Sequence, residues 1–123
     1  MARLGIAFLL LLMALTANGA EITGSVTVVT TDYGNLDTDV TYQQLQDLGF
    51  DVGDAFVIIH GEKRVTAHFG STYGDVAKGE WVGMLNGMGN LRLARNFENA
   101  AETLGIEVGD AITIATEEST SSD

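Results

Sequence analysis

The residues best suited to chemistry lie in one stretch near the carboxyl end of the chain. Residues 85–101 read LNGMGNLRLARNFENAA, which predicts a strand, a tight glycine turn, a second strand and a short helix. Arg95 and Asn96 fall where the second strand gives way to the helix. Because the first N–H groups of a helix have no partner within the helix, we expect this junction to hold a flat, acceptor-rich ring such as a nucleobase.

Other chemistry finds little support in the sequence. His60 and His68 lie on neighbouring strands of one predicted hairpin, but two histidines without a third suitably spaced ligand are weak evidence for a metal site. The acidic residues are scattered and suggest no tuned acid–base couple. No serine sits in a nucleophile elbow, and the Gly87-x-Gly89 turn precedes a strand where a phosphate loop needs a helix. We therefore expect no catalytic residue, no metal and no cofactor.

The first 20 residues have the features of a signal peptide. A positive start, Met1–Arg3, precedes an apolar run over residues 4–15 and a small-residue region over residues 16–20. The alternative is an uncleaved membrane anchor, which the shortness of the apolar run disfavours. We expect cleavage after Gly19 or Ala20, and export to the periplasm or to the medium.

Composition limits the kind of domain and the kinds of partner expected for the rest of the chain. Residues 21–123 suffice for one small domain, which we place over residues 21–116, with a polar, disordered tail over residues 117–123. The sequence has no cysteine, so disulfides and thiol chemistry are excluded, and its formal charge is −11. This charge disfavours nucleic acid and anionic membrane surfaces as partners.

Short strands separated by turn residues dominate the rest of the sequence. A loop of ten residues over Gly70–Gly79 is long enough to be functional. We expect Asn96 to cap the second helix and Gly105 to end it. Many short strands with two short helices predict a mainly β protein, a small antiparallel β-barrel. The strands are expected over residues 24–31, 36–40, 55–60, 63–69, 80–86, 90–95 and 111–115, and the helices over residues 41–49 and 97–104.

One internal echo is visible. Residues 48–55 read LGFDVGDA and residues 104–111 read LGIEVGDA. Each copy ends a predicted helix, turns and starts a strand. We interpret the echo as a repeated helix-to-strand connection, and neither copy has the character of a site.

Four motifs in order resemble the C-terminal domain of the S-adenosylmethionine hydroxide adenosyltransferases, a domain shared with the related chlorinases and fluorinases. The motifs are an aromatic-Gly-Asn turn over 32–35, an aromatic loop ending in Gly-Glu over 71–80, a hairpin with a terminal Asn over 86–96, and a closing Leu-Gly-x-x-x-Gly-Asp over 104–111. The resemblance covers residues 24–114. In the family this domain supplies the adenine side of the S-adenosylmethionine site.

The resemblance implies a role for several residues. Tyr33 and Tyr73 correspond to aromatic walls, and the amide of Asn35 would bind the edge of adenine. Arg95 and Asn96 fall on a fluorinase-type Arg-Asn pair. The implied ligand-binding set is Tyr33, Asn35, Tyr73, Asn86, Arg95, Asn96 and Phe97. Taken one at a time, the tyrosines also suit half-buried barrel aromatics, Asn35 a plain turn residue and Arg95 a surface cation.

Two departures from the family pattern limit the expected function. Gly87 and Met88 stand where the family often has Ser and a polar residue facing the methionine tail, and the sequence holds no counterpart of the N-terminal catalytic domain. We therefore expect an exported, non-catalytic module that binds adenosine, S-adenosylmethionine or a related purine compound. The alternatives are one half of a split S-adenosylmethionine hydrolase with a separate catalytic chain, and a structural domain without a ligand. Self-association is also compatible with the sequence.

Overall fold

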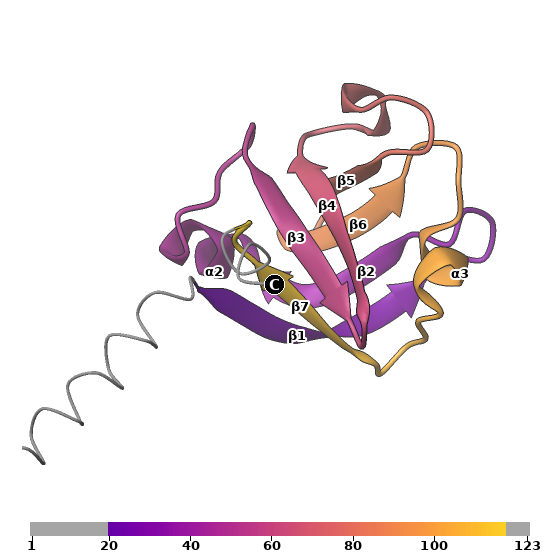
Figure 1. Cartoon of the computed structure of the whole chain (residues 1–123), viewed down its shortest axis with the longest axis horizontal. Coiled ribbons are helices and arrows are strands. Elements are labelled where there is room, and N and C mark those ends of the chain that lie inside the picture. Colours follow the sequence, from indigo (N-terminus) through magenta and orange to yellow (C-terminus); the bar gives the residue numbers. More distant parts are fainter. Residues whose placement is uncertain (1–19, 118–123) are drawn as a thin grey trace, which may run out of the picture.

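A closed barrel of seven strands forms the body of the protein in the computed structural model, which describes residues 20–117 (Figure 1). Going round the barrel, the strand order is β1-β2-β6-β5-β4-β3-β7. Residues 1–19 of the predicted signal peptide and residues 118–123 of the predicted tail lie outside the described residues. The elements are β1 (Glu21–Val29), β2 (Leu36–Thr41), α2 (Tyr42–Asp47), β3 (Ala55–His60), β4 (Lys63–Phe69), the 3-10 turn η1 (Tyr73–Asp75), β5 (Trp81–Leu85), β6 (Asn90–Arg95), α3 (Ala100–Leu104) and β7 (Ala111–Ala115).

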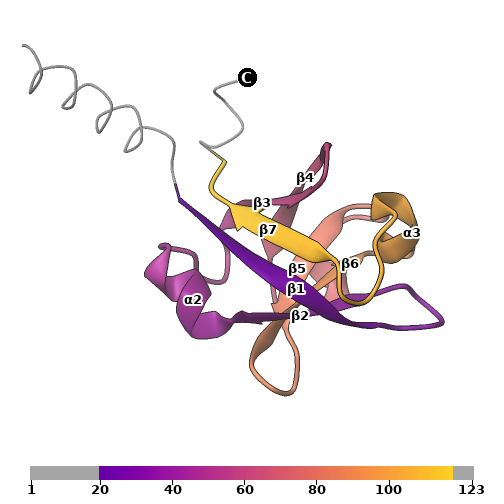
Figure 2. The same cartoon turned by 90° about the horizontal axis from the view of Figure 1, so that it is seen from below.

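The prediction of a mainly β barrel with two short helices is confirmed. Six of the seven neighbouring strand pairs are antiparallel, and the exception is the parallel pair of β4 and β5. This pair joins Ala67–Phe69 to Trp81–Gly83. Helices α2 and α3 lie on opposite sides of the barrel in both views (Figures 1 and 2). No helix within residues 20–117 has the length and apolar character needed to span a membrane.

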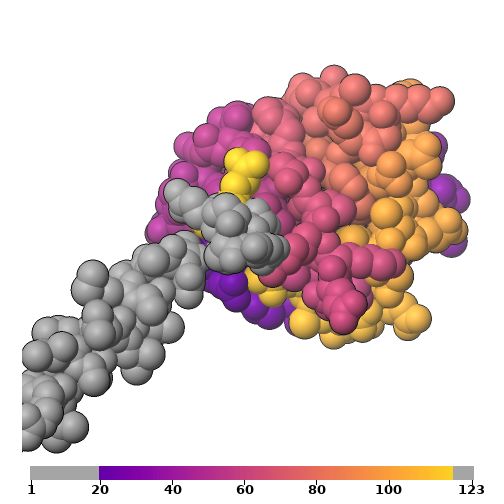
Figure 3. All heavy atoms as spheres, in the orientation of Figure 1, coloured from indigo at the N-terminus to yellow at the C-terminus, as the bar shows by residue number. Residues whose placement is uncertain are grey.

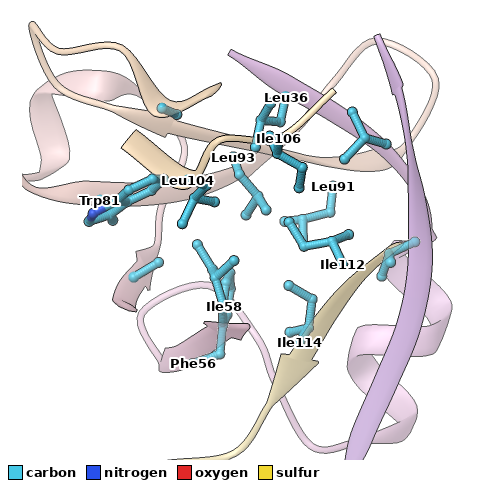
Figure 4. Packing of buried hydrophobic residues seen from close by; sticks show 14 of the residues in the cluster. Leu36, Phe56, Ile58, Trp81, Leu91, Leu93, Leu104, Ile106, Ile112 and Ile114 are labelled. Carbon is cyan, nitrogen blue, oxygen red and sulfur yellow. The ribbon is translucent and has the colours of Figure 1, made fainter. Parts of the chain in front are cut away.

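Alternating side chains fill the barrel. On β6, Leu91 and Leu93 point inward and are fully buried, while Arg92 between them faces out and is partly exposed. Phe56 packs edge-on against both Phe50 and Phe69, with ring centres 5.7 and 6.0 Å apart. Such pairs add to the free energy gained from apolar burial. Figure 4 shows this core, with Leu36, Phe56, Ile58, Trp81, Leu91, Leu93, Leu104, Ile106, Ile112 and Ile114 labelled.

The first helix begins close to its predicted start. Thr41 is the N-cap of α2, and its hydroxyl accepts a hydrogen bond from the N–H of Gln44 while the Gln44 side chain accepts one from the N–H of Thr41. This reciprocal arrangement is a capping box, which fixes the start of the helix.

The second helix begins later than predicted, so the expectation that Asn96 is its cap is wrong. Asn99 is the N-cap, and its side-chain oxygen accepts a 2.9 Å hydrogen bond from the N–H of Glu102. Phe97 has a φ of 65°, a left-handed conformation that cannot continue into a helix. Gly105 ends α3 as expected, with a φ of 66°. The Arg95-Asn96 pair therefore precedes an irregular turn and not a helix N-terminus.

Candidate ligand-binding site

A cavity of about 370 Å³ opens beside the carboxyl end of β6. Three segments enclose it: the β1–β2 turn, the segment over residues 70–80, and the turn between β6 and α3. Its walls contain six of the seven residues expected at the ligand site, together with Glu98, which the sequence analysis missed. The lining residues are Tyr33, Asn35, Tyr73, Arg95, Asn96, Phe97 and Glu98.

The β1–β2 turn presents Tyr33 outward and Asn35 inward. The Asn35 N–H donates to the Thr30 hydroxyl at 2.9 Å, and the Asn35 carbonyl accepts from the Thr30 N–H at 3.0 Å. Gly34 has a φ of 64°, which a glycine adopts at little cost. As a result Tyr33 is 71 % exposed and Asn35 only 6 %. An exposed aromatic face thus lies next to a buried amide.

The segment over residues 70–80 is folded around one carboxylate. The Asp75 side chain accepts hydrogen bonds from the N–H groups of Ser71 and Thr72, at 2.7 and 3.2 Å. These backbone hydrogen bonds lower the pKa of Asp75 because they favour its charged form. The turn places the Tyr73 hydroxyl 2.8 Å from the Asn35 side-chain nitrogen, which donates to it.

The side chain of Arg95 connects several elements of the cavity wall. Its Nε donates to the carbonyl of Gly79 at 2.9 Å and its Nη1 donates to the hydroxyl of Thr103 at 3.0 Å. The guanidinium also lies 5.7 Å from the centre of the Trp81 ring, a favourable cation–π distance. With these contacts in place, the side chain joins β6, α3 and the 70–80 segment.

Asn96 holds the same segment through both its backbone and its side chain. Its N–H donates to the Glu80 carbonyl at 2.9 Å, its carbonyl accepts from the Gly79 N–H at 2.7 Å, and its Nδ2 donates to the Val76 carbonyl at 2.9 Å. In Figure 3 the atoms of residues around 75–80 and of residues around 95–105 adjoin one another on the molecular surface. Arg95 and Asn96 thus position the cavity wall as well as lining it.

Phe97 and Glu98 form the outer rim. Phe97 is 80 % exposed in its left-handed conformation, and within residues 20–117 its N–H has no hydrogen-bond partner. Backbone strain at an exposed aromatic residue is unusual, and such strain often accompanies a functional position. Glu98 was missed because its only signal in the sequence is its place next to Phe97.

Asn86 does not reach the cavity. Its side-chain oxygen accepts hydrogen bonds from the N–H groups of Met88 and Asn90, at 2.9 and 3.1 Å. It thereby shapes the β5–β6 turn at the other end of β6, where the Tyr42 N–H donates to the Gly89 carbonyl. Gly87 and Met88 lie in the same turn and are absent from the cavity wall. Asn86 therefore lies apart from the cavity that the other six expected residues line, and its role in ligand binding stays a prediction.

An ion pair lies beside Tyr73. Asp37 on β2 faces Arg92 on β6, and the guanidinium donates two hydrogen bonds to the carboxylate, at 2.6 and 3.2 Å. The hydrogen bond from Arg92 lowers the pKa of Asp37, and the same bond raises the pKa of Arg92. The neighbouring Tyr73 hydroxyl raises the pKa of Arg92 further. A charged, part-buried pair thus supports the wall of the cavity.

The two histidines are separated along their hairpin. His60 pairs with Lys63 next to the turn, whereas His68 pairs with Ala55 at the far end. Among residues 20–117 no three metal-binding side chains converge. The histidines therefore give no positive evidence for a metal site.

A comparison with protein families identifies the family of this domain. The model of the SAM hydroxide adenosyltransferase C-terminal domain matches residues 24–113. The chain belongs to this family. No curated protein matches the chain.

Two solved structures share the fold of this family member. An uncharacterized conserved protein from Thermotoga maritima is 30% identical with a TM-score of 0.72, and the match covers 76% of this chain and 35% of that one. A conserved hypothetical protein from Thermus thermophilus is 24% identical with a TM-score of 0.51, covering 75% and 34%; this likeness concerns the fold alone. The chain thus spans about a third of the length of either protein.

Proposed function

We propose that this domain is a non-catalytic module that binds adenosine or a related purine compound. The observation that carries the proposal is the convergence of Tyr33, Asn35 and Tyr73 with the Arg95–Phe97 strand end around one cavity. These residues come from three segments far apart in the sequence. The family implies an adenine-binding role for the same positions.

The chemistry of the cavity suits a purine. The exposed rings of Tyr33 and Phe97 offer faces for stacking, which contributes about 1–3 kcal/mol per base. The nitrogen of Asn35 is engaged by Tyr73, which leaves the amide oxygen to accept a hydrogen bond from an exocyclic amine. The N–H of Phe97 is available to donate to a ring nitrogen. One acceptor beside one donor matches the edge of adenine.

A second candidate is one half of a split S-adenosylmethionine hydrolase. The match covers 35% of the solved Thermotoga maritima protein, and in this candidate a separate catalytic chain contributes the other part of the active site. In this candidate the purified domain alone releases no adenosine from S-adenosylmethionine, and the missing partner restores the release.

We further propose that the protein is exported to the periplasm or the medium. The basis is the positive start and the apolar run of residues 1–20. Cleavage after Gly19 fits best, because the Ala20 carbonyl accepts a hydrogen bond from the Thr116 N–H and so extends the β1–β7 pairing. With this acidic charge, neither nucleic acid nor a membrane surface is proposed as a partner after cleavage.

Calorimetry of the purified domain with adenosine and with S-adenosylmethionine tests the proposal. We expect adenosine to bind, and Tyr33→Ala and Asn35→Ala to weaken binding tenfold or more. Met88→Ala is the matched control, because Met88 is 85 % exposed and lies in the β5–β6 turn away from the cavity.

Two outcomes would count against the proposal. Absence of adenosine binding at millimolar concentration would favour the structural domain without a ligand. Adenosine released from S-adenosylmethionine by the domain alone, and lost in Asn35→Ala, would show that the module is an enzyme after all.

A further inference from the structure

The echo at residues 48–55 and 104–111 extends well beyond one connection. Residues 34–36 and 89–91 both read GNL, at an offset of 55, and the later motifs repeat at an offset of 56. The shared segments contain β2, α2 and β3 in the first copy and β6, α3 and β7 in the second. A strand–helix–strand unit therefore occurs twice, with one extra residue in the second copy.

The two copies pair about a twofold axis. Ile58 and Ile114 occupy equivalent positions and pair with each other between β3 and β7. Asp37 and Arg92 are likewise equivalent and pair with each other between β2 and β6. When equivalent residues face one another across both junctions, an approximate twofold axis passes through both.

Hydrogen bonds also link the two copies, and the equivalent glycines Gly34 and Gly89 both act as acceptors. The Tyr42 N–H at the start of α2 donates to the Gly89 carbonyl, and the Ala101 N–H near the start of α3 donates to the Gly34 carbonyl. The connections after the helices also match. The Asp54 carboxylate accepts from the Asp51 N–H at 2.8 Å, and the Asp110 carboxylate accepts from the Glu107 N–H at 2.9 Å.

One segment breaks the symmetry. In the first half, the single strand β1 pairs with both β7 and β2. In the second half, this pairing is divided between β4, which pairs with β3, and β5, which pairs with β6. The chain between β4 and β5 is the 70–80 segment. An insertion into one continuous strand explains why β4 and β5 run parallel while every other pair is antiparallel.

The surface under this segment differs between the copies in the manner expected of an insertion. Val82, Met84 and Ala94 are buried beneath Tyr73 and Val76 in a cluster separate from the main core. The counterpart of Met84 in the first copy has no such cover. The residue paired with Asp37 is Val28, 45 % exposed, whereas the residue paired with Arg92 is Met84, 7 % exposed.

The cavity lies at one of the two symmetry-related junctions between the copies, with Tyr33 and Asn35 contributed by the first copy and Asn96 and Phe97 by the second. The counterparts of Tyr33, Asn35, Asn96 and Phe97 are Met88, Asn90, Thr41 and Tyr42. There Thr41 caps α2 directly and Tyr42 begins the helix. In the second copy the helix begins only at Ala100, and Phe97 lies in a left-handed turn before it.

We propose that the barrel is a fused duplication, and that the 70–80 segment was inserted into its second copy to build the ligand site. The segment supplies Tyr73 and holds Asn96 in place, while the twofold barrel supplies the fold. The part of this proposal that concerns the ligand rests on the proposed function. The part that concerns the duplicated barrel rests on the strand pairing alone. It predicts that ligand binding and folding can be separated at this segment.

The test replaces residues 71–78 with a Gly/Ser linker of equal length, so that the crossover from β4 to β5 is kept. We expect one cooperative thermal transition, lowered by no more than about 10 °C, and adenosine affinity reduced at least tenfold. A second variant adds Met84→Thr, which limits the newly exposed apolar surface. The matched control changes the turn equivalent to the β1–β2 turn, with Gly87→Ser and Met88→Ser between β5 and β6, and retains both folding and binding.

The two proposals fail in different ways. If neither linker variant unfolds cooperatively, the segment is part of the folding core and the insertion is refuted, whatever the protein binds. If both variants fold and still bind adenosine like the wild type, the segment does not build the site. If the variants fold but the wild type binds no adenosine, the proposed function fails, whereas the conclusion that folding does not need the segment stands. The side-chain amide protons of Asn35 in NMR spectra then report whether Tyr73 ordered this side chain.

Discussion

The side-chain nitrogen of Asn35 donates a hydrogen bond of 2.8 Å to the hydroxyl oxygen of Tyr73. The bond joins the β1–β2 turn to the 70–80 segment across the cavity. Since a side-chain amide has one donating and one accepting end, engaging the nitrogen leaves the oxygen for a ligand. A contact between two wall residues therefore determines which hydrogen-bonding edge the cavity presents.

Replacing Tyr73 with Phe tests this role. The ring stays as a wall, but the amide of Asn35 is released and can present either end to a ligand. We expect the preference for adenosine over inosine, which carries an oxygen in place of the amine, to fall by about fivefold, the equivalent of one hydrogen bond of about 1 kcal/mol. Competition calorimetry with both nucleosides measures the ratio.

Tyr42→Phe is the control for this variant, because the Tyr42 hydroxyl binds Asp51 beside α2. An unchanged ratio in Tyr73→Phe would mean that another group orients the Asn35 amide.

The ion pair of Asp37 and Arg92 predicts a defined pH dependence. The folded protein lowers the pKa of Asp37 through the hydrogen bond from Arg92, so the folded state favours the charged carboxylate. The resulting stabilisation is fully present above the unfolded pKa of about 3.9 and is lost as the pH falls through the lower folded value. Asp37→Asn should therefore cost about 1–3 kcal/mol at pH 7, and the difference from wild type should shrink in strong acid.

Urea denaturation at pH 7 and at pH 3 measures this difference. Asp32→Asn in the exposed β1–β2 turn is a suitable control. A gap between Asp37→Asn and wild type that stays constant over this range would show that the carboxylate charge is not what stabilises the barrel.

A comparison of two glycines distinguishes the energetic cost of backbone strain from that of a steric clash. Both Gly34 and Gly49 have positive φ, 64° and 93°, so alanine is strained at either position by about 1–2 kcal/mol. At Gly34 the new methyl group also collides with the side chain of Asn99, whereas at Gly49 nothing lies within 4 Å. We expect Gly34→Ala to lower the free energy of unfolding distinctly more than Gly49→Ala. Equal losses in thermal denaturation would show that Asn99 moves aside freely.

The sequence was informative where local chemistry decides the structure. Strands β3, β4, β6 and β7 begin and end at the predicted residues, because turn residues bound alternating apolar runs. The start of α3 was mistaken because Asn96 and Asn99 are both acceptable caps. The choice between them depends on Phe97, whose left-handed conformation directly follows Asn96, a residue hydrogen-bonded to the 70–80 segment.

Part of the site could be predicted from the sequence for a related reason. The family pattern located the residues of three segments that the barrel then brings together, and six of the seven line one cavity. It could not show that Asn86 serves the β5–β6 turn at the far end of β6. Nor could it show that β4 and β5 pair in parallel, since this depends on where a long connection returns to the sheet.

Because Phe97 has a left-handed conformation, we expect that replacing it with glycine raises the stability of the domain and weakens ligand binding. A non-glycine residue at positive φ costs about 1–2 kcal/mol, and an exposed ring recovers little of this through packing. Phe97→Gly removes the strain, and after the larger entropy of the unfolded glycine chain is subtracted, the domain should gain about 0.5–1 kcal/mol. Phe97→Ala removes the same ring but keeps the strain, so this variant should gain nothing. Both should bind adenosine more weakly, because each lacks the aromatic face at the rim. Denaturation curves and calorimetry of the two variants side by side distinguish the contributions, and a glycine variant no more stable than the alanine variant would rule out strain at this position.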